Sequence, residues 1–219
     1  MYLARILRPR FAVFAVIYGP TLIILLFIAV ASVCGNIEPA FFCRDPTATL
    51  HAHPLTGMQS NISVLAWCVT TTVCIFSHVV LRFRASATTE ASFFLWAGLL
   101  TFMITIDDLF LIHEDLLHRY FGSWIYGKLL YICYALFSAW FLIRFRRIII
   151  HSEFLMLLLA YLFFAAALMI DIFDERWLSP WRIFFEDGFK LLGIVSWGGY
   201  LIRLCFRAIQ GRFKEVAGQ

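Results

Sequence analysis

Charged residues are scarce in this chain: Asp, Glu, Lys and Arg make up only 15% of its 219 residues, whereas 62% are hydrophobic. A soluble domain is about a quarter charged. Apolar runs of about 20 residues, enough to cross a hydrocarbon core of roughly 30 Å, recur along the chain instead. The composition therefore excludes a soluble globular domain and predicts an all-α integral membrane protein.

Long polar segments and common catalytic motifs are also missing. The longest segment between apolar runs is residues 34–60, which is too short for a soluble domain between spans. The sequence contains no G-x-S-x-G, P-loop, G-x-G-x-x-G or H-E-x-x-H motif and no C-x-x-C pair. The chemistries that these motifs carry are therefore unsupported, and no nucleic-acid partner is expected.

Six apolar stretches are long enough to span a bilayer. Gly19-Pro20 lies inside the first and should kink that helix, because proline lacks the N–H that a helix needs. The sequence thus predicts one polytopic membrane domain, residues 1–219, built as a six-transmembrane helical bundle with an outer loop at 34–60. The predicted spans are residues 11–33, 61–81, 92–115, 125–143, 154–172 and 183–205.

Basic residues indicate the orientation of this bundle. Twelve of the 18 Lys and Arg residues lie at ends of the predicted spans that share one face of the membrane. Because basic residues favour the cytoplasmic side, both termini are expected inside, and the protein is expected in the cell inner (plasma) membrane, surrounded by the lipid bilayer. The twelve residues are Arg5, Arg8, Arg10, Arg82, Arg84, Arg144, Arg146, Arg147, Arg203, Arg207, Arg212 and Lys214.

Acidic residues gather on the other side. Of 14 Asp and Glu residues, only Glu90, Glu153 and Glu215 are predicted on the cytoplasmic face. Acids contribute little to topology, so this partition needs a separate explanation.

The stretch DDLFLIHEDLLH, residues 107–118, concentrates these acids at the end of the third predicted span. If the span is one continuous helix, Asp107, Glu114 and His118 follow i, i+7, i+11 and share one stripe. Asp108 and Asp115 form a neighbouring stripe, and His113 projects from a flank. This sorting predicts that the charged face looks into protein or water rather than lipid.

The fifth and sixth spans supply matching groups at the same predicted depth. Together, the three spans and their flanks carry nine acids against five bases, an excess of four negative charges if all ionise. Buried charges are costly unless they are paired, so protons, cations or water must balance this excess. The acids are Asp107, Asp108, Glu114, Asp115, Asp171, Asp174, Glu175, Glu186 and Asp187, and the bases are Arg119, Lys128, Arg176, Arg182 and Lys190.

A divalent metal ion is one way to balance the charge. Carboxylates with one or two imidazoles suit Zn, Mn or Fe, and all-oxygen sets suit Ca. Water activated by such a metal would make the protein a membrane hydrolase of a lipid-like substrate. The predicted ligands are Asp107, Asp108, Glu114, His118, Asp171, Glu186 and Asp187, with His113, Asp115 and Lys190 beside them.

Three alternatives stay open. In the first alternative, the acids form only a structural network of ion pairs, and Glu186 and Lys190 make an i, i+4 pair within it. A proton or cation channel or transporter needs polar groups further along the spans, and the sequence offers Thr101, Thr105, Ser138, Ser196 and His78 there but no acid in the inner half. An accessory subunit of a larger membrane complex would use the aromatic residues, 18% of the chain, as a contact surface with other subunits.

Overall fold

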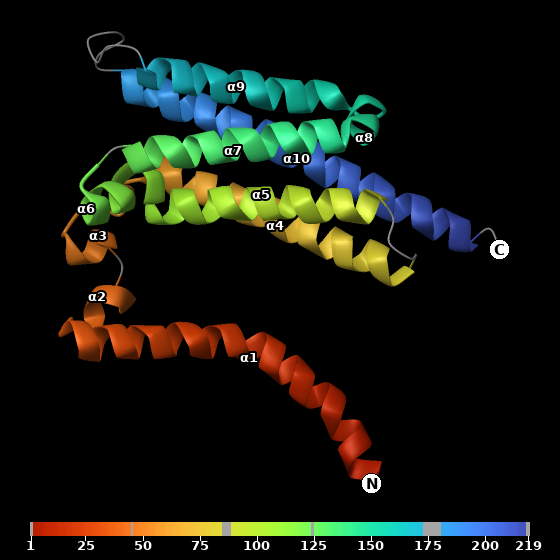
Figure 1. The fold of residues 1–219 in the computed structure, drawn as a ribbon, viewed down its shortest axis with the longest axis horizontal. Coiled ribbons are helices and arrows are strands. Elements are labelled where there is room, and N and C mark those ends of the chain that lie inside the picture. The colour runs from red at the N-terminus through yellow and green to blue at the C-terminus, as the bar shows by residue number, and fades with distance from the viewer. Residues whose placement is uncertain (1, 45, 85–88, 124, 173–180, 218–219) are drawn as a thin grey trace. The chain divides into compact units, whose positions relative to one another are not determined.

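The computed structural model describes residues 2–44, 46–84, 89–123, 125–172 and 181–217. It is 88% helical, and the described residues contain no strand (Figure 1). This confirms the all-α class. The chain divides into two units, residues 1–56 and 57–219, which are described separately below.

The first unit consists of α1 (Tyr2–Gly35) and two short helices, α2 (Ala40–Cys43) and α3 (Pro46–Thr49). The ribbon of α1 bends along its length, in keeping with its internal Gly19-Pro20 pair (Figure 1). The helix stops at Asn36, whose φ of +50° is left-handed, and the Ile37 N–H donates back to the Ser32 carbonyl over 3.1 Å. Asparagine tolerates this conformation and so closes the helix.

The second unit contains the long helices and the connections between them. The long helices are α4 (Met58–Arg84), α5 (Thr89–Phe110), α7 (Ile125–Arg144), α9 (Phe154–Ile172) and α10 (Arg182–Ala217). The π-helix η1 (Ile112–Leu116) and α6 (Leu117–Phe121) join α5 to α7, and α8 (Arg146–Ile150) joins α7 to α9. We call the end where α5 stops and α10 starts the η1 end, and the opposite end the α8 end.

Five helices of the described chain are long and apolar enough to cross a membrane. They are Met58–Phe83, Thr89–Phe110, Ile125–Arg144, Phe154–Asp171 and Arg182–Gln210, which match the last five predicted spans closely. The first predicted span falls within α1, where the stretch Thr21–Gly35 is apolar but shorter. A membrane protein is therefore indicated, whereas the six-span count and the orientation stay predictions.

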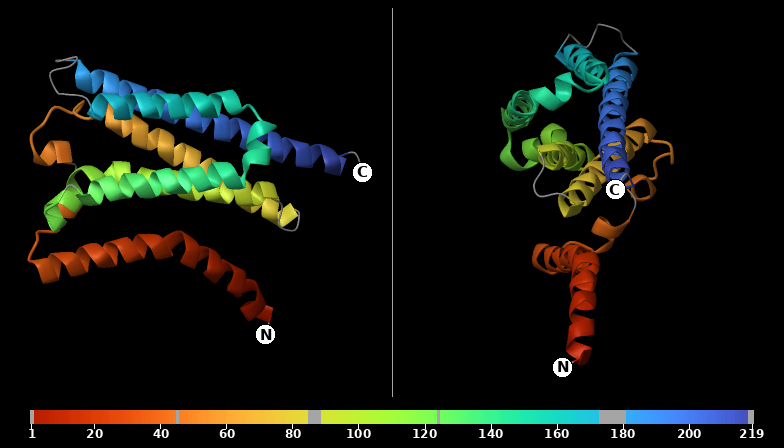
Figure 2. Two further views of the ribbon diagram at one scale, coloured as in Figure 1. Left: turned by 45° about the horizontal axis from the view of Figure 1, so that its top comes forward. Right: turned by 90° about the vertical axis from the view of Figure 1, so that its right-hand side faces the viewer.

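The long helices pack as neighbours in the order α9, α10, α4, α5 and α7 (Figure 2). Glycines on α10 permit close approaches to α9 and α4. A Cβ added at Gly193 would lie 2.6 Å from the Phe164 ring of α9, and one at Gly198 would lie 2.5 Å from the Thr70 hydroxyl of α4. Small residues at these points let helix backbones pack tightly, as in other membrane bundles.

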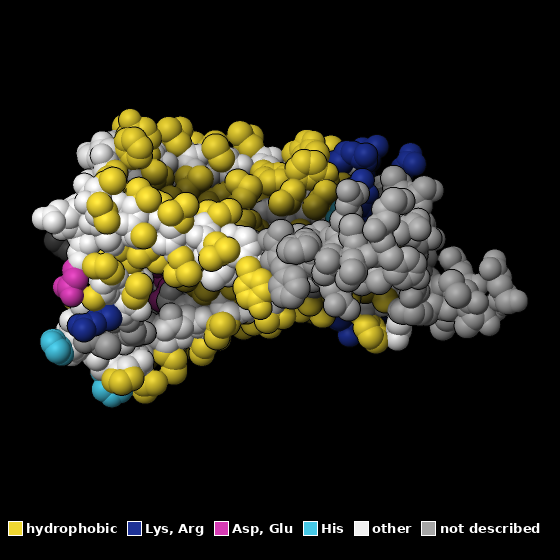
Figure 3. All heavy atoms as spheres, turned by 90° about the horizontal axis from the view of Figure 1, so that it is seen from below, with side chains coloured by type: hydrophobic (Ala, Val, Ile, Leu, Met, Phe, Trp, Pro, Cys, Tyr) yellow, Lys and Arg dark blue, Asp and Glu magenta, His cyan; other side chains and the backbone are white. Residues whose placement is uncertain are grey.

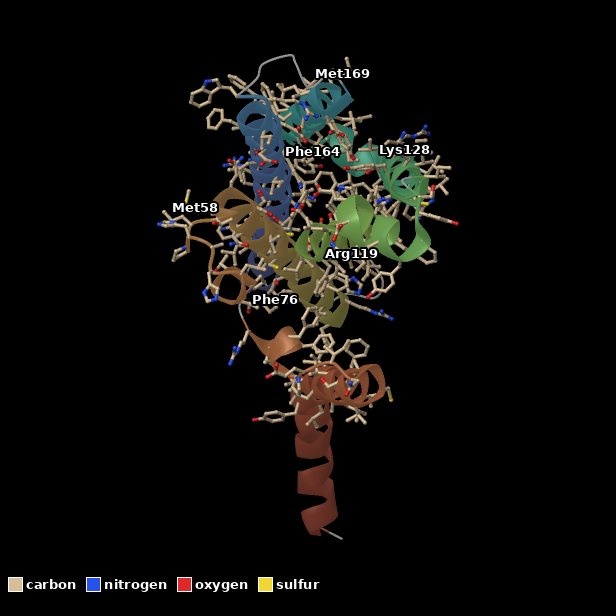
Figure 4. The ribbon with its side chains drawn as sticks, turned by 90° about the vertical axis from the view of Figure 1, so that its left-hand side faces the viewer. Met58, Phe76, Arg119, Lys128, Phe164 and Met169 are labelled. Atoms are coloured by element: carbon tan, nitrogen blue, oxygen red, sulfur yellow. The ribbon has the colours of Figure 1, made fainter. Side chains whose placement is uncertain are left out.

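Aromatic side chains fill the interior of this unit. The Phe141 ring of α7 lies 5.0 Å from Phe93 of α5 and 6.4 Å from Trp197 of α10, measured between centroids. Phe164 points inward between helices, whereas Lys128 and Met169 lie on the outside (Figure 4). Exposed large hydrophobic side chains occur along all five long helices of this unit, as expected for contact with lipid, and hydrophobic side chains also cover much of the face of the molecule shown in Figure 3.

The third predicted span is not one continuous helix, and this prediction was wrong. α5 ends at Phe110, Leu111 takes a left-handed conformation with φ +49° and ψ +44°, and η1 restarts as a π-helix. The stripe that joined Asp107 to Glu114 and His118 assumed unbroken helical phase. The break instead turns His113 inward, where its backbone N–H and its ring both reach Asp107.

Candidate functional site

Asp107, in the last turn of α5, is the centre of the polar cluster. Only 3% of its surface is exposed. One carboxylate oxygen accepts the backbone N–H of His113 at 2.9 Å, and the other lies 2.7 Å from His113 Nδ1. A buried carboxylate needs such donors, so the break at Leu111 is linked to the burial of Asp107.

The other side of the His113 ring faces two further groups. Its Nε2 lies 2.7 Å from the Tyr131 hydroxyl of α7 and 3.3 Å from a Glu114 carboxylate oxygen. The His113 side chain is 7% exposed, whereas that of Glu114 is 52% exposed. One imidazole therefore joins a buried carboxylate to a carboxylate at the surface.

Electrostatics favour the protonated form of this imidazole. Burial lowers the pKa of His113, but the hydrogen bonds and negative charges of Asp107 and Glu114 outweigh burial and raise the pKa to about 9. The same contact, led by the hydrogen bond from His113, lowers the pKa of Glu114 below its ordinary value. Near neutral pH the imidazolium thus sits between two carboxylates.

Asp108 makes a second buried pair beside the first. One oxygen, Oδ1, is paired with the Lys190 ammonium of α10, which ties the end of α5 to the start of α10. Its other oxygen, Oδ2, is buried and has no hydrogen-bond partner among the described residues. A buried carboxylate oxygen without a donor is costly, so this atom marks a strained point of the cluster.

Further acids surround these two pairs and form what we call the acidic mouth: Glu114, Asp171, Glu186 and Asp187. Arg182 of α10 bridges two of them, with its guanidinium 3.3 Å from Asp171 Oδ1 and 3.6 Å from Glu186 Oε2. Glu114 lies within electrostatic range of Lys190, Glu186 and Asp187. Acids from η1, α9 and α10 therefore converge at the η1 end.

Other predicted site residues lie apart from this centre. Asp115 is exposed and pairs with Arg119 at 2.9 Å, and His118 is half-buried on α6. The expected Glu186–Lys190 pair is replaced, because Lys190 pairs with Asp108 and Glu186 with Arg182. Asp174, Glu175 and Arg176 lie outside the described residues.

A divalent metal centre finds no support in this arrangement. The described residues include no group of three or more His, Cys, Asp or Glu side chains that could hold a metal ion. The predicted metal and its ligand set therefore stay predictions, and elemental analysis of the purified protein would test them.

Tyr131 was not identified from the sequence as part of the site, and His113 was placed at the flank of the charged helix face rather than at its centre. Both roles depend on the break at Leu111, because residues 107 and 113 do not share a face of a continuous helix. The one local signal was the abundance of titratable groups in DDLFLIHEDLLH, which marks a site without specifying its geometry.

Two buried threonines of α5 follow Asp107 toward the α8 end, and each donates to its own helix. Thr105 donates to the Thr101 carbonyl and Thr101 to the Ala97 carbonyl, each over 2.7 Å. The Trp197 indole N–H donates to the Thr101 hydroxyl at 3.0 Å, and an indole cannot accept a proton in turn. The hydroxyl protons of Thr101 and Thr105 are therefore taken up by backbone carbonyls, and the Thr105 hydroxyl also lies 3.5 Å from that of Thr71 on α4.

Comparison with known proteins gives a family. No curated protein and no solved structure matches the chain. One family profile, described as "Domain of unknown function (DUF8692)", matches residues 15–204, which include every residue of the site. The chain belongs to this family.

Proposed function

We propose that the protein is a proton-coupled membrane transporter whose proton-exchange site is Asp107, His113 and Glu114. The observation that carries this proposal is the position of His113, which contacts the buried Asp107 through one ring nitrogen and the exposed Glu114 through the other. An imidazole takes up a proton at one nitrogen and releases it from the other, so it can pass protons between the two carboxylates.

Tyr131 supports the same exchange. Its hydroxyl lies 2.7 Å from His113 Nε2 and holds that nitrogen when the Glu114 carboxylate, 3.3 Å away, turns toward water. In the neutral ring Nδ1–H donates to Asp107 and Nε2 accepts from Tyr131, whereas in the imidazolium Nε2–H donates. The ring thus has a partner in either charge state.

The neighbouring ion pair links protonation to helix packing. Asp107 and Asp108 are adjacent, one held by η1 and the other by Lys190 of α10. A proton on Asp107 would weaken the contact of α5 with η1, and a proton on Asp108 would weaken its contact with α10. Contacts between helices that form or break with protonation can couple a bound proton to a conformational change.

A transporter fits better than an open channel. Thr101 and Thr105, below Asp107, donate their hydroxyl protons to backbone carbonyls, which disfavours a path of hydroxyls along the spans. A one-sided site must become accessible from the other side by a change of conformation. The acidic mouth favours this role, because its negative charge raises the local concentration of protons and other cations.

Proton movement in reconstituted vesicles tests the proposal. Purified protein is placed in liposomes that hold a pH-sensitive dye, and gradients of Na⁺, K⁺ and Ca²⁺ are imposed in turn. We expect at least one gradient to move protons in the wild type and Asp107→Asn to reduce the rate at least tenfold, because an amide cannot take up the proton.

Asp115→Asn is the matched control, since Asp115 is exposed and pairs with Arg119 alone among the described side chains. Its rate should stay within twofold of the wild type. If no gradient moves protons through the wild type, yet Asp107→Asn lowers thermal stability, the cluster is a structural network and the proposal fails.

A further inference from the structure

A cavity lies at the α8 end, far along the bundle from the acidic mouth. Its volume is about 240 Å³, and it is an open pocket lined by the start of α5, by α8 and by the last part of α10. Its walls are apolar, with Phe93, Phe94 and Leu204 among them, and two charged residues, Glu90 and Arg207, complete the lining. We call this cavity the α8 pocket.

The charged residues of the pocket lie at the ends of membrane spans. Glu90 is in the first turn of the candidate span Thr89–Phe110, and Arg207 is near the end of Arg182–Gln210. Span ends lie where the hydrocarbon core meets the lipid headgroups. The pocket therefore combines apolar walls with charges at headgroup level.

Arg207 has capacity left for a ligand. Its guanidinium is paired with Glu153, but Arg203 holds the same carboxylate through two bonds of 2.7 and 2.9 Å. The hydrogen bond from Arg203 is the main cause that lowers the pKa of Glu153. Two guanidinium groups thus share one carboxylate, and the Arg207 side chain remains 54% exposed.

We propose that the α8 pocket binds a phospholipid whose headgroup carries a phosphate and a protonated primary amine. Arg207 takes the phosphate, because guanidinium binds phosphate oxygens in a bidentate manner. Glu90 takes the ammonium, and the first carbons of the lipid lie on Phe93, Phe94 and Leu204. None of these residues belongs to the proton-exchange site.

The pairing of opposite charges sets the specificity. An anionic glycerol headgroup gives Arg207 its phosphate but leaves Glu90 facing no cation. A choline headgroup has a cation, but its quaternary nitrogen has no N–H to donate to Glu90. The primary amine alone satisfies both charged groups, and an unpaired group left behind is costly.

Binding is measured by native mass spectrometry of the detergent-purified protein. It is titrated with phosphatidylethanolamine, phosphatidylglycerol and phosphatidylcholine of identical acyl chains. We expect phosphatidylethanolamine to bind most tightly and Arg207→Gln to weaken it about fivefold, the value typical of one basic residue near a membrane surface. Equal binding of the three lipids, or tighter binding of phosphatidylglycerol, would overturn the proposal.

Arg147→Gln is the matched control. Arg147 is an exposed basic residue of α8, at the same end of the second unit, and it does not line the pocket. It should leave the preference for phosphatidylethanolamine unchanged. An equal loss in both variants would show a general effect of basic charge and would also overturn the proposal.

Two further measurements identify the determinants. Glu90→Gln should abolish the preference over phosphatidylglycerol, and retention of that preference counts against the assigned role of Glu90. Free phosphoethanolamine should compete only weakly, because it lacks the carbons that contact the apolar walls. If it binds as tightly as the lipid, the ligand is a soluble phosphoamine and the lipid assignment fails.

Discussion

At the scale of single residues, His113 is the group on which the account depends. Its ring is nearly buried, contacts Asp107 on one side, and contacts Glu114 and Tyr131 on the other. Sequence alone could nominate the stretch that holds it, because titratable groups near a membrane span are functional candidates. Sequence could not select His113 over His118, since that choice depends on one left-handed residue, Leu111.

The first prediction concerns the titration of His113. Its pKa is about 9 in the folded protein, above the ordinary value of 6.5. The stabilisation from its contacts is therefore complete below about pH 6.5 and is lost as pH rises through 9. Thermal stability should fall between pH 7 and 10, and His113→Gln should remove most of that slope. An unchanged slope in the variant would contradict the environment described for His113.

At the scale of elements, the helices were predictable and the break in α5 was not. Hydrophobic length alone placed both ends of α4, α7 and α9, and the start of α10, within a few residues of their observed bounds, whereas α10 ends at Ala217, twelve residues beyond the predicted end. The end of α5 was misplaced because its apolar run continues through Leu109, Phe110 and Leu111. A buried carboxylate that gains two donors from His113 offsets the cost of a left-handed leucine, about 1–2 kcal/mol, and no local pattern shows that balance.

Helix packing gives the second prediction, on two glycines of α10. A Cβ at Gly198 would lie 2.5 Å from the Thr70 hydroxyl, whereas nothing lies within 4 Å of one at Gly188. Gly198→Ala should cost about 1–3 kcal/mol by overpacking the contact with α4. Gly188→Ala should stabilise the helix by up to about 1 kcal/mol, because alanine is the better helix former. Unfolding in detergent measures both, and equal effects would contradict the close approach of α4 and α10.

At the scale of the whole molecule, the composition and the distribution of charge predicted the membrane class and the clustering of acids. The apolar helices indicate a membrane protein, and the second unit separates its polar groups between two ends. The η1 end holds the acids of the mouth, and the α8 end holds arginines such as Arg203 and Arg207. The acid clustering read from the sequence reappears as one site at the η1 end. Its partners differ from those expected because ion pairing between helices is set by three-dimensional packing.

The two ends imply a division of tasks in the proposed transporter. The proposed proton-exchange site lies at the η1 end, and the proposed lipid site lies at the α8 end, between α5 and α10. The interior between them is aromatic and closely packed, which suits helices that move as rigid bodies. The proposal thus rests on the proton-exchange site, whose titration should be visible in the activity itself.

The pH dependence of proton movement in reconstituted liposomes is the most direct test. The wild-type rate should fall by half near pH 9, where His113 loses its proton. In Glu114→Gln the rate should fall at least tenfold, as in Asp107→Asn, because an amide cannot take up the proton. A wild-type rate that does not fall near pH 9, or a rate in Glu114→Gln within twofold of the wild type, would contradict the central claim that His113 passes the proton between Asp107 and Glu114.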